Sequence, residues 1–200
     1  MSDAEQHVAE MKKQQQAHRK KQKQVSDPGR GLVLVHTGNG KGKSSSAFGV
    51  IIRALGWGQH VAVVQFIKGK WKTGERQFFE NFDGSVDWFT MGDGFTWDTQ
   101  DKDADTKAAS LAFERGTAML ASGDYDLVVL DEINIALRYN YLSAADVKTG
   151  LEARHERTSV ILTGRDAPAL LCDYADLVTE MREVKHPYKA GIRAQRGIDF

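Results

Sequence analysis

The sequence has one cysteine, three prolines and no excess charge of either sign. A lone Cys172 excludes a disulfide within the chain and is typical of a reducing compartment. No run of about 18 apolar residues occurs, so we expect no transmembrane helix. The first residues are polar and lack the apolar stretch of a secretory signal. These features predict a cytoplasmic protein with no membrane partner.

Charge is balanced overall but unevenly distributed. The 27 basic and 27 acidic residues cancel, which does not favour a nucleic-acid partner. Residues 1–28 are rich in Gln, Lys and His and lack aromatic residues, so they cannot bury much surface alone. We expect a basic amino-terminal extension there. It is either disordered or a helix that covers the site of a partner subunit. Residues 29–200 are long enough for one domain with a substantial core.

Apolar runs alternate with helical patterns from residue 32 onward. Short, fully apolar strands separated by helices predict a parallel sheet covered on both faces. The fold class expected is therefore α/β, a three-layer P-loop NTPase-like domain with a mostly parallel central sheet. The expected strands are 32–36, 61–67, 86–90, 126–130, 158–162 and 176–180, and the expected helices are 44–55, 104–121, 143–155 and 167–173.

The segment HTGNGKGKSSSAFG, residues 36–49, lies between the first strand and the first helix of this pattern. It resembles a phosphate-binding loop, although Thr37 stands where the usual spacing has a glycine. Glycines allow sharp turns that direct N–H groups inward, and the helix that follows offers its positive end to an anion. Lys43 can reach phosphate oxygens, and the Ser44 hydroxyl can bind Mg²⁺. The residues expected to contact the nucleotide are Gly38, Asn39, Gly40, Lys41, Gly42, Lys43, Ser44 and Ser45.

Two acids, Asp131 and Glu132, end the apolar strand in DLVVLDEIN. Ligands of such sheets bind at the carboxyl ends of the strands, where an acid can share the metal held by Ser44. Asp131 has a second interpretation, as the N-cap of the following helix. We favour the metal site, for Mg²⁺ or Mn²⁺, with Glu132 as the preferred ligand and Asp131 as the alternative.

Aromatic residues mark a second candidate surface. In MGDGFTWDTQ, the spacing of Phe95 and Trp97 directs both rings to one face of an extended segment. They either pack in the core or form a lid for a large apolar ligand. The segment QFIKGKWKTGERQFF adds a basic and aromatic rim with Lys68, Trp71 and Arg76.

The motifs TGNGKGKSSSAFG, VQFIKGKWKTGE, GFTW, VVLDE, ILTGR and KHPYKAGIRAQRGIDF resemble those of the CobA-type ATP:corrinoid adenosyltransferases. They occur in the family's order and cover residues 31–200. Ser44 stands where the family often has threonine, and either residue offers a hydroxyl. The segment DEINIALRYNYL is a looser match than VVLDE.

This resemblance implies a reaction in which the loop holds ATP but no phosphoryl group reaches an acceptor. Cobalt(I) of a corrinoid attacks the 5′ carbon of the ribose, and the whole triphosphate leaves. Lys43 is then a catalytic residue that neutralises charge on the departing oxygen. Phe95 and Trp97 match the family's aromatic pair under the corrin ring, and Arg165 matches its arginine near the phosphates. The alternative for Arg165 is a surface charge before a helix.

The resemblance also implies partners. It predicts a reduced flavoprotein as electron donor, and a homodimer in which each amino-terminal helix covers the neighbour's site. Two alternatives are a P-loop ATPase motor and a small-molecule kinase. The neutral charge and single domain disfavour the first, and one cysteine cannot supply the zinc-bound lid typical of the second. A nucleotide-binding regulator without catalysis stays open.

Overall fold

The computed structural model describes residues 2–66, 73–90 and 101–199 of the chain, which divides into two compact units at Arg30 and Gly31. In the first unit, α1 (Asp3–Gln22) is a 20-residue helix of which no residue is buried. A capping box begins it: the Glu5 N–H donates to the Ser2 hydroxyl and the Ser2 N–H to the Glu5 carboxylate. The basic extension is thus a helix with an entirely exposed surface.

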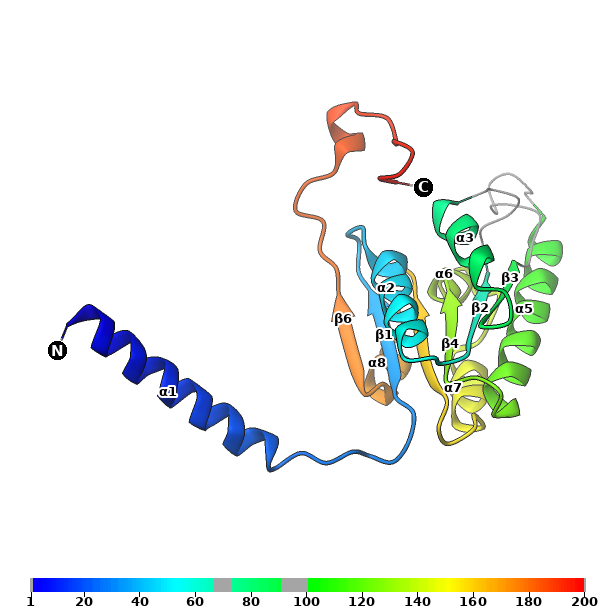
Figure 1. Cartoon of the computed structure of the whole chain (residues 1–200). Coiled ribbons are helices and arrows are strands. Elements are labelled where there is room, and N and C mark those ends of the chain that lie inside the picture. Colours follow the sequence, from blue (N-terminus) through cyan, green and yellow to red (C-terminus); the bar gives the residue numbers. More distant parts are fainter. Residues whose placement is uncertain (1, 67–72, 91–100, 200) are drawn as a thin grey trace. The chain divides into compact units, whose positions relative to one another are not determined.

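In the described part of the second unit, six parallel strands form one sheet in the order β3-β2-β4-β5-β1-β6 (Figure 1). The predicted α/β class with a parallel sheet is confirmed. Each strand lies within two residues of its predicted position. The strands are β1 (Val33–Thr37), β2 (Val61–Gln65), β3 (Val86–Thr90), β4 (Leu127–Asp131), β5 (Ser159–Thr163) and β6 (Leu177–Glu180).

The predicted helices are found, and two short ones were missed. Both α3 and α6 have only six residues, which give little helical periodicity, although α8 of the same length was expected. The helices of this unit are α2 (Lys43–Gly56), α3 (Gly74–Phe79), α5 (Lys102–Ser122), α6 (Ile133–Arg138), α7 (Ala144–Glu152) and α8 (Ala169–Tyr174), with 3₁₀ turns at Glu80–Phe82 and Pro187–Ala190.

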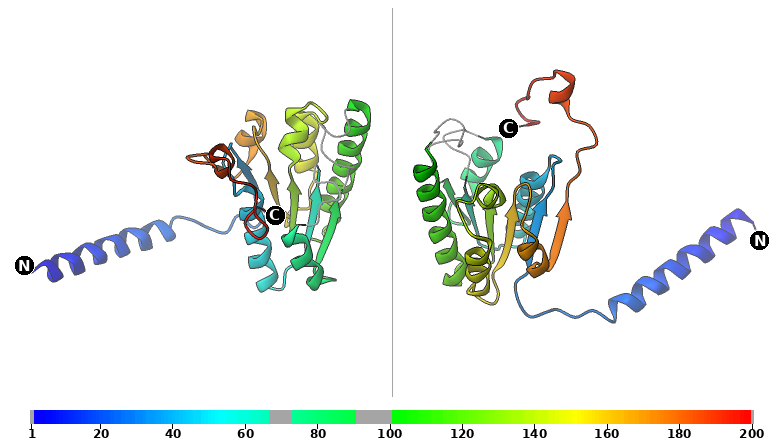
Figure 2. Two further views of the ribbon diagram at one scale, coloured as in Figure 1. Left: turned by 90° about the horizontal axis from the view of Figure 1, so that it is seen from above. Right: turned by 180° about the vertical axis from the view of Figure 1, so that it is seen from behind.

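Two apolar layers sandwich the sheet, which explains the uninterrupted apolar strands. Alternate residues of a strand point to opposite faces, so a strand covered on both faces is apolar throughout. On β2, Val61 and Val63 pack with α2 and α3, whereas Ala62 and Val64 pack with α5, α6, α7 and α8. Figure 2 shows these helices on the two sides of the sheet.

The strand order brings three carboxyl ends together. Because β4, β5 and β1 are neighbours and all run the same way, Asp131, Thr163 and Thr37 end at one edge of the sheet. The loop after β1 and the acids after β4 therefore meet there, although about 90 residues separate them in sequence.

Removing residues 1–30 should leave the thermal unfolding midpoint of the remaining chain unchanged to within about 2 °C. The reason is that α1 buries no residue. As a control, Leu130→Ala in the fully buried β4 should lower the free energy of unfolding by about 2–5 kcal/mol. Calorimetry of both variants checks this, and loss of a cooperative transition in the deletion variant would contradict it.

Candidate functional site

The predicted phosphate loop runs from the end of β1 to the start of α2. It turns through two glycines in the left-handed region, Gly38 with φ +94° and Gly42 with φ +111°. Gly42 is also the N-cap residue of α2, whose first turn contains no acid. The loop thus delivers the positive end of a 14-residue helix to the carboxyl edge of the sheet.

The glycine pattern has a second cause in the chain that follows β6. The Gly40 N–H donates to the Met181 carbonyl at 2.6 Å, and the Met181 N–H donates to Thr37 at 2.8 Å. A Cβ atom on Gly40 would lie 2.8 Å from the Arg182 backbone, and one on Gly38 would collide with the backbone of Met181. The GNG spacing therefore lets a neighbouring segment approach, besides allowing the turn.

Lys43 points back into this loop. Its ammonium donates to the Gly38 carbonyl at 2.8 Å and to the Gly40 carbonyl at 2.6 Å, and the residue is only 7% exposed. Burial lowers the pKa of Lys43, while the nearby Glu132 carboxylate opposes this shift. The arrangement holds a cation where oxygens of a bound phosphate can replace the two carbonyls.

His36, at the end of β1, anchors the start of α2. Its Nδ1 lies 3.3 Å from the Lys43 carbonyl, which can only accept, so Nδ1 carries the proton. Burial lowers the pKa of His36, partly opposed by this hydrogen bond. The neutral imidazole of His36 therefore holds the backbone of Lys43 in place.

Asp131 and Glu132 have different surroundings. Asp131 is fully buried, and its two oxygens accept hydrogen bonds from Gln65 and Thr163 at 2.9 and 2.8 Å. Glu132 is half-buried in the left-handed region, with φ 64°, and its charge acts on Lys43. The N-cap position of α6 is Glu132, without a side-chain capping bond, so the capping interpretation of Asp131 is wrong. Of the two acids, Glu132 is the one whose charge acts on Lys43.

A buried lysine, a helix N-terminus and a facing carboxylate are the parts of a metal-nucleotide site. The family model of ATP:corrinoid adenosyltransferase BtuR/CobO/CobP matches residues 29–200 of the chain. This chain belongs to that family.

Curated relatives agree with the family model. The "Corrinoid adenosyltransferase" of Pseudomonas aeruginosa is 52% identical over 171 residues, which cover 86% of this chain and 84% of that protein. A Sinorhizobium protein of the same name is 45% identical and covers 99% of this chain and 93% of its own. "Corrinoid adenosyltransferase CobA" of Salmonella typhimurium is 47% identical, with 86% of both chains covered.

A solved structure shows the fold at greater distance. Flagellar accessory protein FlaH from Methanocaldococcus jannaschii superposes with a TM-score of 0.50 at 12% identity, covering 76% of this chain and 70% of that one. At this identity the likeness concerns the fold alone.

The other loop residues of this family member lie around Lys43. Ser44 is half-buried and Ser45 exposed in the first turn of α2, and Asn39 lies in the turn between the glycines. Lys41 points away from Lys43 and pairs with Asp199 near the carboxyl terminus, with its side chain 53% exposed. Of the two loop lysines, Lys41 is thus the more exposed, and a bound phosphate can replace Asp199 as its partner.

Arg165 follows β5, close enough to Lys43 for its charge to lower the pKa of that lysine. It precedes α8 by four residues, so it does not sit in that helix's first turn. Asp166, which pairs with Arg138 at 3.2 Å, acts on Lys43 in the opposite sense. Arg165 is itself exposed, and its role at the phosphates stays a prediction.

Phe95, Trp97, Lys68 and Trp71 lie outside the described residues. Of the predicted rim, Arg76 is described: it pairs with Glu80 at 3.6 Å and donates to the Thr90 hydroxyl at 3.4 Å. Arg76 therefore stands beside the end of β3, where the aromatic segment begins.

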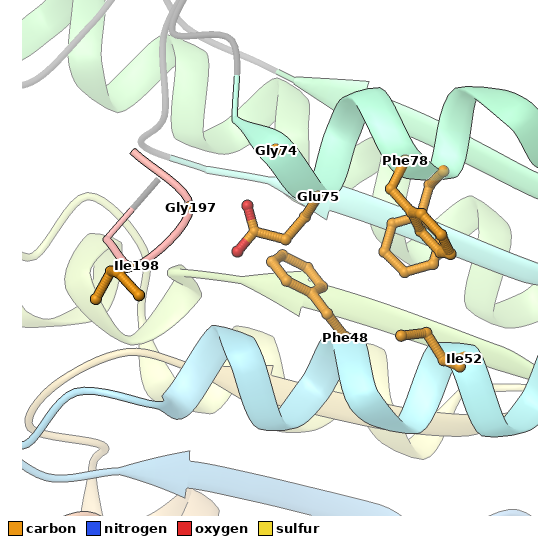
Figure 3. Close-up of a pocket in the computed structure, with 8 residues that line it drawn as sticks. Phe48, Ile52, Gly74, Glu75, Phe78, Gly197 and Ile198 are labelled. Carbon is orange, nitrogen blue, oxygen red and sulfur yellow. The ribbon is translucent and has the colours of Figure 1, made fainter. Parts of the chain in front are cut away.

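An apolar cavity of about 330 Å³ lies beside the loop rather than in it (Figure 3). Phe48 and Ile52 of α2 face the residues of α3 across it, and Gly197 and Ile198 of the carboxyl-terminal segment complete its lining. Sequence reasoning did not find this cavity, because its walls come from three distant segments.

Three further residues of the site were also missed: the polar Gln65 and Thr163, and Gly164. Gln65 and Thr163 end apolar strands, in VAVVQ and SVILT, and a polar residue at that place is the signal that was available. Gly164, with φ +126°, has no such signal, because its need for glycine comes from Asn134 and Glu132 packed against it.

Gly40→Ala should weaken ATP binding and lower the free energy of unfolding by about 1–3 kcal/mol, since the added methyl group overlaps the Arg182 backbone. Gly49→Ala is the matched control, because a Cβ on Gly49 has nothing within 4 Å and lies within α2. The control should gain about 0.5–1 kcal/mol and bind ATP normally. Denaturant unfolding and nucleotide titration measure both. Equal ATP affinity in the two variants would contradict the proposed packing.

Proposed function

We propose that this chain transfers the 5′-deoxyadenosyl group of ATP to cobalt(I) of a corrinoid and releases triphosphate, as a step in cobalamin biosynthesis and salvage. Membership of the adenosyltransferase family supports the reaction class. The proposal depends above all on the position of Lys43. Its ammonium group is bound by two loop carbonyls and interacts electrostatically with Glu132 and Arg165.

In this reaction the loop acts as a clamp on the leaving group. When the carbon–oxygen bond at the 5′ position breaks, negative charge grows on the triphosphate oxygen that departs. Lys43, the loop N–H groups and the start of α2 place positive charge at the phosphates before the bond breaks, which stabilises the transition state. Arg165 adds a second cation from the end of β5. Lys41 adds another when the phosphates replace Asp199 as the partner of its ammonium group.

The residues present fit Mg²⁺, or Mn²⁺ in its place. Among the described residues no group of three or more His, Cys, Asp or Glu side chains converges, so they form no complete metal cage. Mg²⁺ is usually held by one or two protein oxygens together with phosphates and waters. Ser44 and Glu132 are the residues that would hold it. When bound, the ion supplies positive charge to the triphosphate.

The corrinoid side of the proposal rests on Phe95 and Trp97. We place them against the lower face of the corrin, where they exclude an axial ligand and water from cobalt(II). Cobalt without that ligand is easier to reduce to the nucleophilic cobalt(I). The protein thus eases the reduction of the substrate's cobalt by keeping an axial ligand and water away from it.

We further propose a reduced flavoprotein as electron donor, a homodimer and a cytoplasmic location. The exposed surface of α1, a unit of its own, supports its role as a cover for the site of a second subunit. No helix in the described parts of the chain is long and apolar enough to cross a membrane.

Incubation of the protein with ATP, Mg²⁺ and chemically reduced corrinoid should yield triphosphate and a cobalt–carbon bond in equal amounts. Lys43→Ala should lower the rate by about 100- to 1000-fold, the usual cost of losing one donor to developing negative charge. Lys148→Ala, which removes a lysine paired with Glu152 on α7, is the control and should keep the rate. ADP with orthophosphate would instead indicate an ATPase, and ADP with a phosphorylated acceptor would indicate a kinase.

Phe95→Ala and Trp97→Ala should separate reduction from alkyl transfer. With a protein reductant, adenosylation should collapse, because a reopened lower face lowers the potential of bound cobalt(II), and ~59 mV corresponds to tenfold for one electron. With cobalt(I) prepared chemically, much of the rate should return. Trp57→Ala, at a residue that is 82% exposed, controls for the loss of an aromatic ring. Equal losses with both reductants and a lower unfolding temperature would mean that the rings pack in the core.

A further inference from the structure

A chain of buried hydrogen bonds crosses the carboxyl edge of the sheet beneath Glu132. Gln65 ends β2, Asp131 ends β4 and Thr163 ends β5, and these residues are 3%, 0% and 0% exposed. The Gln65 amide donates to Asp131 Oδ2 at 2.9 Å, and the Thr163 hydroxyl donates to Asp131 Oδ1 at 2.8 Å. The Glu132 N–H donates to the Thr163 hydroxyl at 2.9 Å.

The direction of each bond is determined by its partners. The Thr163 oxygen accepts from the Glu132 N–H, so its single proton is directed to Asp131. The Trp88 indole N–H can only donate, and it reaches Gln65 Oε1 at 3.0 Å. The amide nitrogen of Gln65 therefore faces Asp131, whose two carboxylate oxygens each accept one hydrogen bond.

This chain of hydrogen bonds holds the backbone of Glu132 in place. Glu132 has φ 64°, a conformation that non-glycine residues adopt seldom and only where their surroundings enforce it. The Thr163 hydroxyl binds its N–H group directly. A Cβ atom on Gly164 would lie 3.3 Å from the Glu132 carboxylate, so this carboxylate rests on a backbone without a side chain.

The sheet itself does not need these polar groups. β2, β4 and β5 are joined by their backbone pairing, and apolar residues of similar shape would serve a purely structural role. A fully buried carboxylate is costly unless it is hydrogen-bonded on both oxygens, as here. Its position directly before Glu132, with both oxygens hydrogen-bonded, therefore indicates a role in positioning that residue.

We propose that Asp131 and Thr163 are positioning residues that orient Glu132 as the protein's carboxylate ligand to the nucleotide-bound Mg²⁺, with Gln65 holding Asp131. The inference rests on the proposed function insofar as the loop binds a metal nucleotide. Asp131 itself is then no metal ligand, although it directly precedes one. Gln65 also accepts hydrogen bonds from Trp88 and Thr90. The chain of hydrogen bonds therefore reaches β3, just before the segment of the sequence that contains Phe95.

Equilibrium binding of ATP, with and without Mg²⁺ and in the absence of corrinoid, tests the role of Thr163. The quantity measured is the gain in ATP affinity on adding Mg²⁺. Thr163→Val should reduce this gain by about 10- to 100-fold, as expected when a residue that orients a metal ligand is lost. Metal-free ATP affinity should not change. Thr163→Ser keeps the hydroxyl and should restore the gain.

Thr158→Val is the matched control. Thr158 is also 0% exposed, lies at the opposite end of β5, and donates its hydroxyl to the Tyr125 carbonyl at 2.8 Å. It should lose stability as Thr163→Val does and keep the full gain with Mg²⁺. An unchanged gain in Thr163→Val, or an equal fall of metal-free affinity, would overturn the proposal.

A paired substitution distinguishes positioning from metal ligation by Asp131. Asp131→Asn alone places two amide nitrogens opposite each other and should reduce the gain. Combining it with Gln65→Glu moves the carboxylate across the pair and permits every hydrogen bond again, including those from Trp88 and Thr163. The double variant should recover the gain. Failure to recover it in a folded double variant would mean that the Asp131 carboxylate binds the metal and would overturn the proposal.

These outcomes are independent of the adenosyl transfer. A wild-type protein that shows the Mg²⁺ gain and its dependence on Thr163, yet forms no cobalt–carbon bond, would overturn the proposed function alone. A wild-type protein that forms the bond with the same ATP affinity with and without Mg²⁺ would overturn the positioning role alone.

Discussion

The ammonium group of Lys43, held by two carbonyls of its own loop, is the interaction on which the site depends. A cation that is 7% exposed needs oxygen partners, and Gly38 and Gly40 provide them only because the loop turns through left-handed glycines. Lys43 thereby holds a positive charge inside the loop before any ligand binds. Phosphate oxygens can replace these carbonyls without rebuilding the loop.

The rest of the edge is arranged around that charge. Burial, the largest effect, and Arg165 lower the pKa of Lys43, whereas Glu132 and Asp166 oppose this shift. A bound triphosphate would add negative charge, which Lys43 and, in our proposal, a divalent ion held by Ser44 and Glu132 would offset. Such a site is suited to a leaving group that gains charge as it departs, which is the demand of adenosyl transfer.

Two features separate this edge from an isolated phosphate loop. The segment after β6 packs against Gly38 and Gly40, so the loop is supported from outside as well as from the helix. The carboxyl-terminal residues return to it, with Asp199 on Lys41 and Ile198 at the apolar cavity of α2 and α3. The family motif at the carboxyl terminus thus has a physical place beside the nucleotide loop.

Much of this protein could be predicted from local sequence. The apolar strands, four helices of the second unit (α2, α5, α7 and α8) and the strand-loop-helix order around Lys43 follow from periodicity and glycine placement, which act over a few residues. The resemblance of the loop, VVLDE and ILTGR to the adenosyltransferases identified the family that the comparisons show. Two of the three six-residue helices, α3 and α6, were not predicted, because fewer than two turns leave little periodicity to detect.

Only the tertiary structure separated the two acids and explained the glycines. The sequence left Asp131 open as an alternative to Glu132. The two differ in the structure because Gln65 and Thr163, 66 and 32 residues from Asp131, donate hydrogen bonds to the Asp131 carboxylate. Gly40 is required because Met181 and Arg182 pass beside it. Local sequence determines which elements form, whereas the order of the strands decides which of their ends become neighbours, and that order depends on contacts between distant residues.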